Sequence, residues 1–349
     1  MIRHLTLLGA FGAFLYAQQP PITNADLRQA SASSGLESAI AKSVANLKGA
    51  GWIGYAVPAI PGDHNSCCWN DNGRGCGLEG QRRVEAVAGA QTPVRLEGPS
   101  HVVILLRFEQ GTSDKLRVFS PDCPLDAGGL PFYWLSNVKP AESVATLTNW
   151  AARQQENTAR NQRSESAVHA IAMHAGPEAQ AALLKFAEPS QIESTRKSAL
   201  FWLANFRGKA GYEVVSKVVR EDTSDKMREH AIFALTQSKE PEAIPTIIRV
   251  AKEDKSPKVR SQALFWLGQK VSKPASEAIN EAIERDPDTE VKKKALFALS
   301  QLPKDEGVPR LIQIARNHSN PVVRKQAMFW LGQSHDPRAV DFFEQILIK

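Results

Sequence analysis

One five-residue motif returns along the second half of the chain at a constant interval. It begins at Ala199 as "ALFWL", and each later copy begins 32 residues after the one before. No insertion or deletion interrupts this spacing, and a degenerate first copy, "AVHAI", begins at Ala167. A fixed interval of this length is typical of proteins built from stacked repeats. The later copies begin at Ala231, Ala263, Ala295 and Ala327.

Each repeat contains two stretches with the apolar spacing of a helix. In one unit "PEAIPTIIRVAKED" is followed by "SPKVRSQALFWLGQ", where Ser256 and Pro257 suit a helix start and Gly268 lies near its end. A helix pair of this size cannot bury itself alone, but stacked pairs share one continuous core. The sequence therefore predicts a mainly α fold, a right-handed α-solenoid of about six 32-residue helix pairs over residues 140–349. We expect pairs to begin near Pro140, Pro177, Gly208, Pro241, Pro274 and Asp305, with a last helix from Pro337.

In three repeats an aspartate lies six residues before a basic residue of the second helix. Together with "VRSQALFWLG", this pattern resembles HEAT repeats, in particular the short units of phycobilisome lyases. The resemblance covers about the last 185 to 210 residues, and it implies that these charges join successive repeats. Two units depart from it, because Ser190 precedes Arg196 and His318 precedes Arg324. The matching pairs are Asp222 and Arg228, Asp254 and Arg260, and Asp286 and Lys292.

The repeats also carry a phenylalanine and a side-chain amide on a second helical face. With Ala263 at zero and 100° per residue, Trp266 lies at about −60°, on the face expected to be buried, whereas Phe265 lies at about −160°. The phenylalanine recurs as Phe201, Phe233, Phe265, Phe297 and Phe329. The amide recurs as Asn205, Gln237, Gln269, Gln301 and Gln333.

The resemblance to HEAT repeats implies that the second helix of each pair lines a concave surface. The two rows would then face a protein or peptide partner: aromatic rings could hold alternate side chains of an extended chain, and amides could bind its backbone. Armadillo repeats use a related arrangement of asparagine and tryptophan. We therefore predict that the ten residues of the two rows bind a polypeptide. The competing interpretation is that each phenylalanine fills the seam between neighbouring repeats, which leaves the amides as partners at helix ends.

The residue after each phenylalanine alternates between alanine and tryptophan, so the full period is 64 residues. Large side chains opposite small ones at adjacent seams fill space well. We therefore assign the tryptophans to the core between repeats rather than to a ligand site. The alternating residues are Ala170, Trp202, Ala234, Trp266, Ala298 and Trp330.

Residues 18–139 lack the repeat and change character. We expect a helix from Asn24 to Leu47, followed by β-rich runs such as "GWIGYAV", "HVVILLRFEQ", "KLRVFS" and "PFYWLSNV". The polar "EQGTSDK" between two of these runs predicts a hairpin. The sequence thus predicts a small α+β domain with an antiparallel sheet.

All four cysteines lie in this domain, within "DHNSCCWNDNGRGCG" and "SPDCPLDAGG". An even number in an exported chain predicts two disulfides, with three connectivities open. Adjacent cysteines should have different partners. A metal site with His64, or a redox role for the adjacent pair, is the alternative, but the spacing matches no zinc template and we predict no metal. The disulfide candidates are Cys67, Cys68, Cys76 and Cys123.

Residues 1–17 have the pattern of a secretory signal peptide. Arg3 and His4 precede an apolar run from Leu5 to Tyr16, which ends at the small residue Ala17. We expect cleavage after Ala17 and export to the periplasm or the medium; an uncleaved anchor is the alternative. No later stretch has the roughly 20 apolar residues of a membrane span.

The net charge of +6 belongs to the second half, because residues 1–150 hold 12 basic and 12 acidic side chains and residues 151–349 hold 31 and 25. The basic residues alternate with acids, as on a solvated helical surface, and neither a basic block nor a reading motif is present. We therefore expect no nucleic-acid partner.

The histidines form no recognisable catalytic triad or metal motif. His64, His169, His174 and His230 are best explained as surface or packing residues. Deoxyhypusine hydroxylase, a HEAT-like enzyme, binds iron through His-Glu pairs, and this sequence contains no His-Glu dipeptide. We predict a non-enzymatic interaction scaffold of the cell envelope that needs no cofactor. The alternative is an enzyme or ligand-binding protein whose site lies in the N-terminal domain near the cysteine loop.

Overall fold

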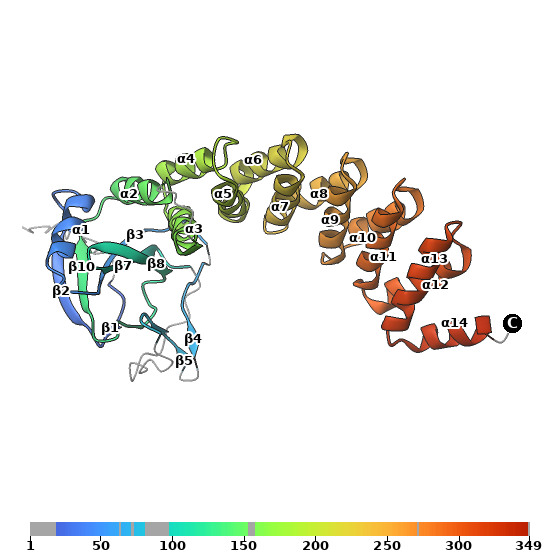
Figure 1. Ribbon diagram of the computed structural model, residues 1–349, viewed down its shortest axis with the longest axis horizontal. Coiled ribbons are helices and arrows are strands. Elements are labelled where there is room, and N and C mark those ends of the chain that lie inside the picture. Colours follow the sequence, from blue (N-terminus) through green and yellow to red (C-terminus); the bar gives the residue numbers. More distant parts are fainter. Residues whose placement is uncertain are drawn as a thin grey trace, which may run out of the picture. The chain divides into compact units, whose positions relative to one another are not determined.

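The computed structural model describes residues 19–62, 64–70, 73–80, 98–152, 158–270 and 272–347. The chain divides into two compact units, residues 1–179 and residues 180–349 (Figure 1). The signal peptide expected at residues 1–17 lies outside the described residues. The strands, all in the first unit, are β1 Ile22–Thr23, β2 Asp26–Ser31, β3 Gly51–Pro58, β4 Trp69–Asn70, β5 Gly73–Arg74, β6 Cys76–Gly77, β7 His101–Glu109, β8 Thr112–Phe119, β9 Leu125–Asp126 and β10 Pro131–Ser136.

A five-stranded mixed sheet forms the centre of the first unit, in the order β2-β10-β3-β7-β8. The expected hairpin is confirmed, because β7 and β8 pair antiparallel around Gln110 and Gly111, which both have positive φ as a tight hairpin turn requires. The expected antiparallel sheet is wrong for β10, which runs parallel to both β2 and β3. No tight turn joins β10 to either neighbour, so nothing local fixes its direction.

The helix expected from Asn24 to Leu47 is only half correct. Residues Asp26–Ser31 form strand β2, and the helix α1 runs from Leu36 to Ala45. Every residue of β2 pairs with β10, so strand pairing overrides the local helical pattern. Gly35 ends the connection with φ 110°, which favours glycine, and α1 begins at the next residue.

The helices α2 (Pro140–Ala152) and α3 (Thr158–Met173) pack on the sheet, where α2 contacts β3 and α3 contacts β8. A buried hydrogen-bond chain helps to join them: the Oγ atom of Ser143 lies 2.9 Å from the Tyr55 hydroxyl and 2.8 Å from His174 Nε2. The helix pair expected at Pro140 is therefore present. Because its partner is the sheet, it belongs to the first compact unit, whereas the repeat spacing assigns it to the solenoid.

The second unit consists of helices in the expected order. Their starts lie within two residues of those read from the repeat, so the predicted helical array is confirmed. The helix α4 (Pro177–Phe186) spans the division between the units. The others are α5 Glu193–Phe206, α6 Gly208–Glu221, α7 Asp225–Leu235, α8 Ala243–Glu253, α9 Pro257–Gly268, α10 Lys273–Arg285, α11 Thr289–Ser300, α12 Lys304–Asn317, α13 Pro321–Gln333 and α14 Pro337–Leu347.

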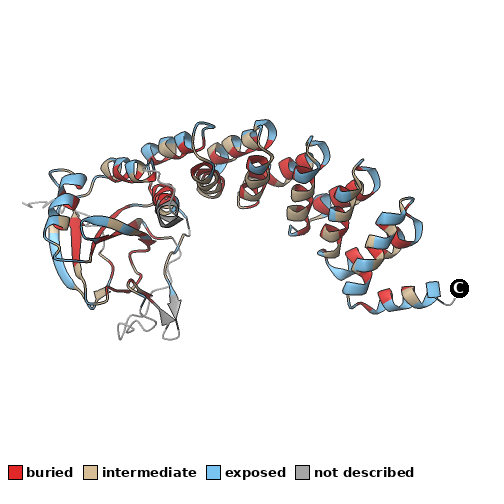
Figure 2. Ribbon diagram, viewed as in Figure 1, coloured by how far each residue is buried: buried red, intermediate tan, exposed pale blue. Residues whose placement is uncertain are grey.

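The helices of the second unit form two layers. Helices α5, α7, α9, α11 and α13 contact one another in sequence order, and α6, α8 and α10 form the other layer (Figure 1). Buried residues lie where the layers meet (Figure 2); in α9 they include Val259, Ala263, Leu264 and Leu267, all fully buried. This is the apolar stripe of a helix packed on one side. Among the described residues, no helix is long and apolar enough to cross a bilayer.

Candidate interaction face of the helical array

Arginines and aspartates join successive repeats, as the sequence pattern predicts. Arg228 is 1% exposed; its Nε donates to Asp254 Oδ2 at 2.9 Å and its Nη1 to the Asp222 carbonyl at 2.8 Å. Arg260 repeats both contacts, with Asp286 Oδ2 at 2.8 Å and the Asp254 carbonyl at 2.8 Å. Each arginine thus binds a loop of its own repeat and the carboxylate of the next. We call these residues the charge ladder.

The pKa of Asp222 reflects its place in the ladder. Burial raises this pKa, but hydrogen bonds from Arg196 and from the Ser224 N–H, together with the two nearby arginines, bring it below its ordinary value. Arg196 Nη2 donates to Asp222 Oδ2 at 2.6 Å although Ser190 occupies the aspartate position of its own repeat. The first departure from the pattern therefore leaves the forward contact intact.

The second departure changes the junction between repeats. Lys292 donates to the carbonyls of Ile283 and Glu284 in its own repeat, at 2.7 and 2.6 Å. His318 occupies the next aspartate position, and its Nε2 lies 3.2 Å from the Ile283 carbonyl. A contact between histidine and a backbone carbonyl here takes the place of the arginine–carboxylate pair of the earlier junctions. Arg324 keeps only the contact within its repeat, to the His318 carbonyl at 2.7 Å.

The phenylalanines of the odd-numbered helices form a continuous row with the tryptophans. The rings of Phe201 and Phe233 stack with centroids 5.6 Å apart, and those of Phe265 and Phe297 stack at 6.0 Å. At the other seams an indole lies between: Phe233 contacts Trp266 at 5.1 Å, and Trp266 contacts Phe265 at 4.9 Å. We call this set the aromatic row; its members are Phe201, Phe233, Trp266, Phe265, Phe297, Trp330 and Phe329.

The row explains the 64-residue alternation. Where a repeat has a buried alanine after its phenylalanine, as at Ala234 and Ala298, its phenylalanine stacks directly on that of the preceding repeat. Where it has tryptophan, the indole takes that place. The indole nitrogens of Trp266 and Trp330 are buried and have no hydrogen-bond partner among the described residues. The indoles therefore fill seams, as the packing interpretation expects, but they are half-buried rather than enclosed in the core, and Trp330 also lines a groove.

The phenylalanine rings are neither fully enclosed nor fully free. Phe201, Phe233, Phe265 and Phe297 are half-buried, and Phe329, which no later odd-numbered helix covers among the described residues, is 52% exposed. Stacking thus fills the seams and still leaves part of each ring accessible, and binding of a polypeptide stays a prediction. The helices that carry the row, α5, α7, α9, α11 and α13, form one of the two layers of the second unit (Figure 1).

A groove of about 830 Å³ opens on this layer, over helices α7, α9, α11 and α13. Its apolar floor is formed by Phe265, Phe297 and Trp330. The sequence places Ser261 and Gln262 on the same face as Phe265, and both line the groove. The charged residues of its lining were not predicted from the sequence; they are Glu229, Lys258, Glu290, Lys293 and Lys294.

The amides lie at the C-terminal ends of the same helices. Gln237 donates from Nε2 to the Thr236 hydroxyl at 2.8 Å, and Gln301 donates in the same way to Ser300 at 3.2 Å. Gln269 is exposed at the end of α9. We call Asn205, Gln237, Gln269, Gln301 and Gln333 the amide row. Its members are accessible or half-accessible, although two of them also bind a neighbouring hydroxyl.

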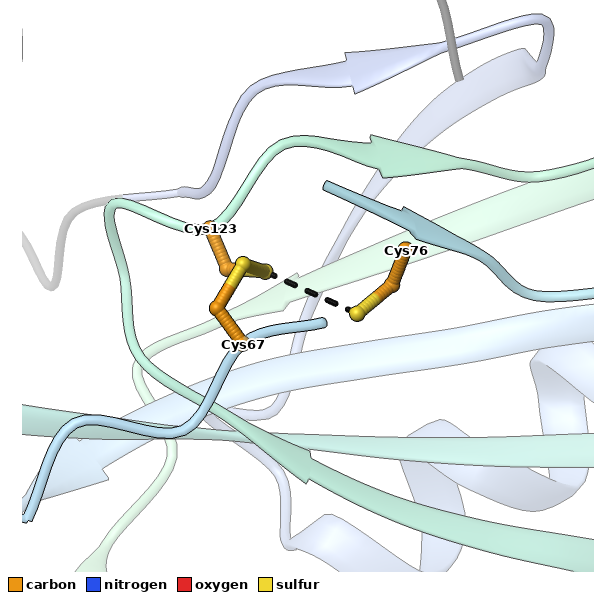
Figure 3. A group of neighbouring side chains, drawn as sticks. All are labelled: Cys67, Cys76 and Cys123. Carbon is orange, nitrogen blue, oxygen red and sulfur yellow. Dashed lines mark hydrogen bonds between the residues drawn. A yellow bond between two sulfur atoms is a disulfide. The ribbon is translucent and has the colours of Figure 1, made fainter. Parts of the chain in front are cut away.

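The cysteines of the first unit form two disulfides, Cys67–Cys123 and Cys68–Cys76. The sulfur atoms of Cys67, Cys76 and Cys123 lie within 4.8 Å of one another (Figure 3), and those of Cys76 and Cys123 are 3.8 Å apart. A zinc ligand must be a thiolate, and a disulfide sulfur carries no such charge. The cluster is therefore part of the core, next to Trp52 and Phe132, and not a set of metal ligands.

The histidines occupy packing positions. His174 is fully buried, with Nδ1 2.7 Å from the Ala170 carbonyl. Burial lowers the pKa of His169 to about 4. Burial also lowers the pKa of His230, whose Nε2 lies 2.8 Å from the Lys197 carbonyl. None of these three lines the groove.

A family model described as HEAT repeats matches residues 212–277 and 276–349. The chain matches no curated protein in sequence. Among solved structures it is similar in fold to the CpcE–CpcF complex of phycocyanin lyase from Nostoc, with 16% identity over 45% of this chain and 97% of that chain and a TM-score of 0.35. Human deoxyhypusine hydroxylase shows 15% identity over 59% and 90% of the chains, with a TM-score of 0.28. The Escherichia coli protein YibA shows 18% over 60% and 76%, with a TM-score of 0.35.

Proposed function

Because the C-terminal part of the chain, residues 212–349, consists of HEAT repeats, we propose that this protein is an interaction scaffold that binds an extended polypeptide along the aromatic and amide rows. A helical array of this kind is commonly a scaffold for protein partners. Fold alone does not assign function, so the proposal depends on the face itself.

The observation that carries the proposal is the partly open aromatic row. Phe265 and Phe297 are half-buried, stack with ring centroids 6.0 Å apart and both line the groove, so each leaves part of its ring open to a partner. Accessible aromatic surface at the floor of a groove is where a partner gains most from burial. The amide row runs beside it and offers both donors and acceptors to a peptide backbone.

We also propose that the protein acts outside the cytoplasm and has no catalytic role. Two disulfides in one small domain fit an oxidising compartment, and the apolar N-terminal run fits export. Mass spectrometry of the protein recovered from a periplasmic extract tests this: the chain should begin at Gln18. Recovery of full-length chain from the cytoplasm alone would contradict export.

The binding proposal is tested with random peptides of about 12 residues displayed on phage and selected against the intact protein, a length that spans about four repeats. Selected peptides are then measured by fluorescence anisotropy. We expect the double variant Phe265→Ala/Phe297→Ala to weaken binding at least about tenfold, because it removes two rings of the groove floor.

The matched control is Val340→Ser, which changes a 56% exposed apolar residue of α14 that does not line the groove. It should bind as the unchanged protein does. Circular dichroism confirms that each variant is folded. Equal affinity of the folded double variant for every selected peptide would exclude the aromatic row as the binding face.

A further inference from the structure

The charges of the groove define the chemistry of its occupant. Resting on the proposed function, we propose that the groove recognises an acidic extended segment, with a carboxylate at about every third residue and apolar side chains between. The repeat pattern does not require this charge, because no one position carries lysine in every repeat: the position of Lys258 is Glu290 in the next repeat, and that of Lys294 is Gln262 in the one before.

Four consecutive repeats each place at least one exposed lysine on this layer. Lys258 and Lys294 line the groove directly. Lys226 is the counterpart of Lys258 one repeat earlier, and Lys325 is the counterpart of Lys293 one repeat later. Lys226, Lys258, Lys294 and Lys325 are all exposed. Two of these lysines thus line the groove, and the other two lie on the flanking helices α7 and α13.

The groove lining holds three lysines and two glutamates, so its formal charge is positive. Glu290 is already engaged, since its Oε2 lies 3.0 Å from Lys293 Nζ. Glu229 is the other acid of the groove. Within the described part of the chain, no carboxylate lies within 4 Å of the ammonium groups of Lys258 or Lys294, whereas Lys293 and Lys197 have such partners. Two groove lysines therefore remain available to the carboxylates of a partner.

The spacing of the helices sets the spacing of the ligand. Packed helices lie roughly 8–10 Å apart, and an extended peptide advances about 3.3 Å per residue. One repeat therefore corresponds to about three peptide residues. Carboxylates about three residues apart would reach lysines on successive helices, while the side chains between them reach the aromatic floor formed by Phe265 and Phe297.

A peptide fits this face better than a nucleic acid. The phosphate backbone of a single strand is uniformly negative, and Glu229 and Glu290 lie among the groove lysines. A polypeptide can place an uncharged residue opposite each glutamate. The amide row at the helix ends, with exposed Gln269 and Gln301, also suits peptide backbone groups.

The experiment compares the composition of the selected peptides with the effect of reversing the lysines. We expect Asp and Glu to be enriched at about every third position. The double variant Lys258→Glu/Lys294→Glu should weaken these peptides at least about tenfold. The control Lys209→Glu/Lys217→Glu makes the same change in net charge on exposed residues of α6, in the other layer, and should change affinity less than about twofold.

Three outcomes would overturn the inference. Enrichment of neutral or basic peptides that still need Phe265 and Phe297 would refute the acidic ligand and leave the proposed function standing. If both lysine variants lower the affinity for acidic peptides equally, the peptides respond to the net charge of the protein rather than to the groove. A labelled oligothymidine that competes with the selected peptides, and depends on Lys258 and Lys294, would assign the groove to single-stranded nucleic acid.

Discussion

Within each of the two units, the stabilising contacts join residues at very different separations along the sequence. In the sheet unit, β2 pairs with β10, so that Asp26 lies opposite Pro131. In the helical unit the charge ladder joins residues only 26 positions apart, such as Arg228 and Asp254. The first unit must close long loops before its core exists, whereas the second gains stability at each junction between neighbours. The disulfide Cys67–Cys123 closes one of the long loops, with a sequence separation of 56 between its cysteines, whereas the helical unit uses repeated ion pairs between neighbouring repeats.

The largest effect should come from breaking one junction of the ladder. Arg228→Ala leaves the carboxylate of Asp254 buried without its arginine, and we expect a loss of about 3 to 5 kcal/mol in the free energy of unfolding. Hydrogen exchange followed by mass spectrometry should show faster exchange in α7 and α9 and unchanged exchange in β3 and β7.

The control for Arg228 is Lys293→Ala, which removes an exposed pair with Glu290 and should cost less than about 1 kcal/mol. Similar losses for both variants would show that the ladder is ordinary surface charge. Faster exchange throughout the sheet as well would show that the two units unfold together, which would break the comparison.

The next largest effect should come from removing the disulfides of the sheet unit. Cys67 and Cys123 are separated by 56 residues and Cys68 and Cys76 by 8. Loop-closure entropy then predicts a loss of about 4 kcal/mol for Cys67→Ser/Cys123→Ser and about 2.5 kcal/mol for Cys68→Ser/Cys76→Ser. Urea unfolding followed by tryptophan fluorescence measures both. A reversed order would mean that local packing, rather than loop length, sets the contribution of each disulfide.

The smallest effect is a pH dependence of stability, which should differ between the two units. Burial lowers the pKa of His169, in the sheet unit, from 6.5 to about 4. Between these values the unfolded chain binds a proton that the folded chain does not, so stability is complete above about pH 6.5 and falls as pH approaches 4. From pH 7 to pH 5 the loss should be about 2 kcal/mol, and His169→Gln should remove it.

His230 provides the comparison for the helical unit. Burial lowers its pKa as well, but the hydrogen bond to the Lys197 carbonyl opposes that shift. We therefore expect His230→Gln to reduce the pH dependence less than His169→Gln does. Urea titrations of both variants at pH 7 and pH 5 provide the test, and a larger change for His230→Gln would contradict this order.

The predictions from sequence are correct for the helices of the repeats. The 32-residue interval located the helices from Gly208 to Pro337 because every repeat buries the same positions against its neighbour. The prediction was wrong at Asp26–Ser31, because this segment forms a strand by pairing with β10, which lies more than 100 residues later in the chain. Such pairing leaves no local signal beyond weak strand propensity.

The candidate face was predicted in part for the same reason. Phe265 and Gln269 recur at fixed positions, so the rows were visible in the sequence. The groove lysines were missed because Lys258 and Lys294 occupy different positions within their repeats. A count of exposed charges by helical face, rather than by repeat position, would have found them.

The substitution of His318 for aspartate has a mechanical consequence. Buried arginine–carboxylate pairs join the junctions that end in Asp222, Asp254 and Asp286, whereas at the His318 junction the ion pair is the more exposed Arg310–Glu284, beside the contact of His318 with the Ile283 carbonyl. Under tension along the array, the α12–α13 pair should detach first and the repeats joined by buried pairs should yield later, at higher force. The array would then begin to extend at this one junction, which lies next to the groove that Trp330 helps to line.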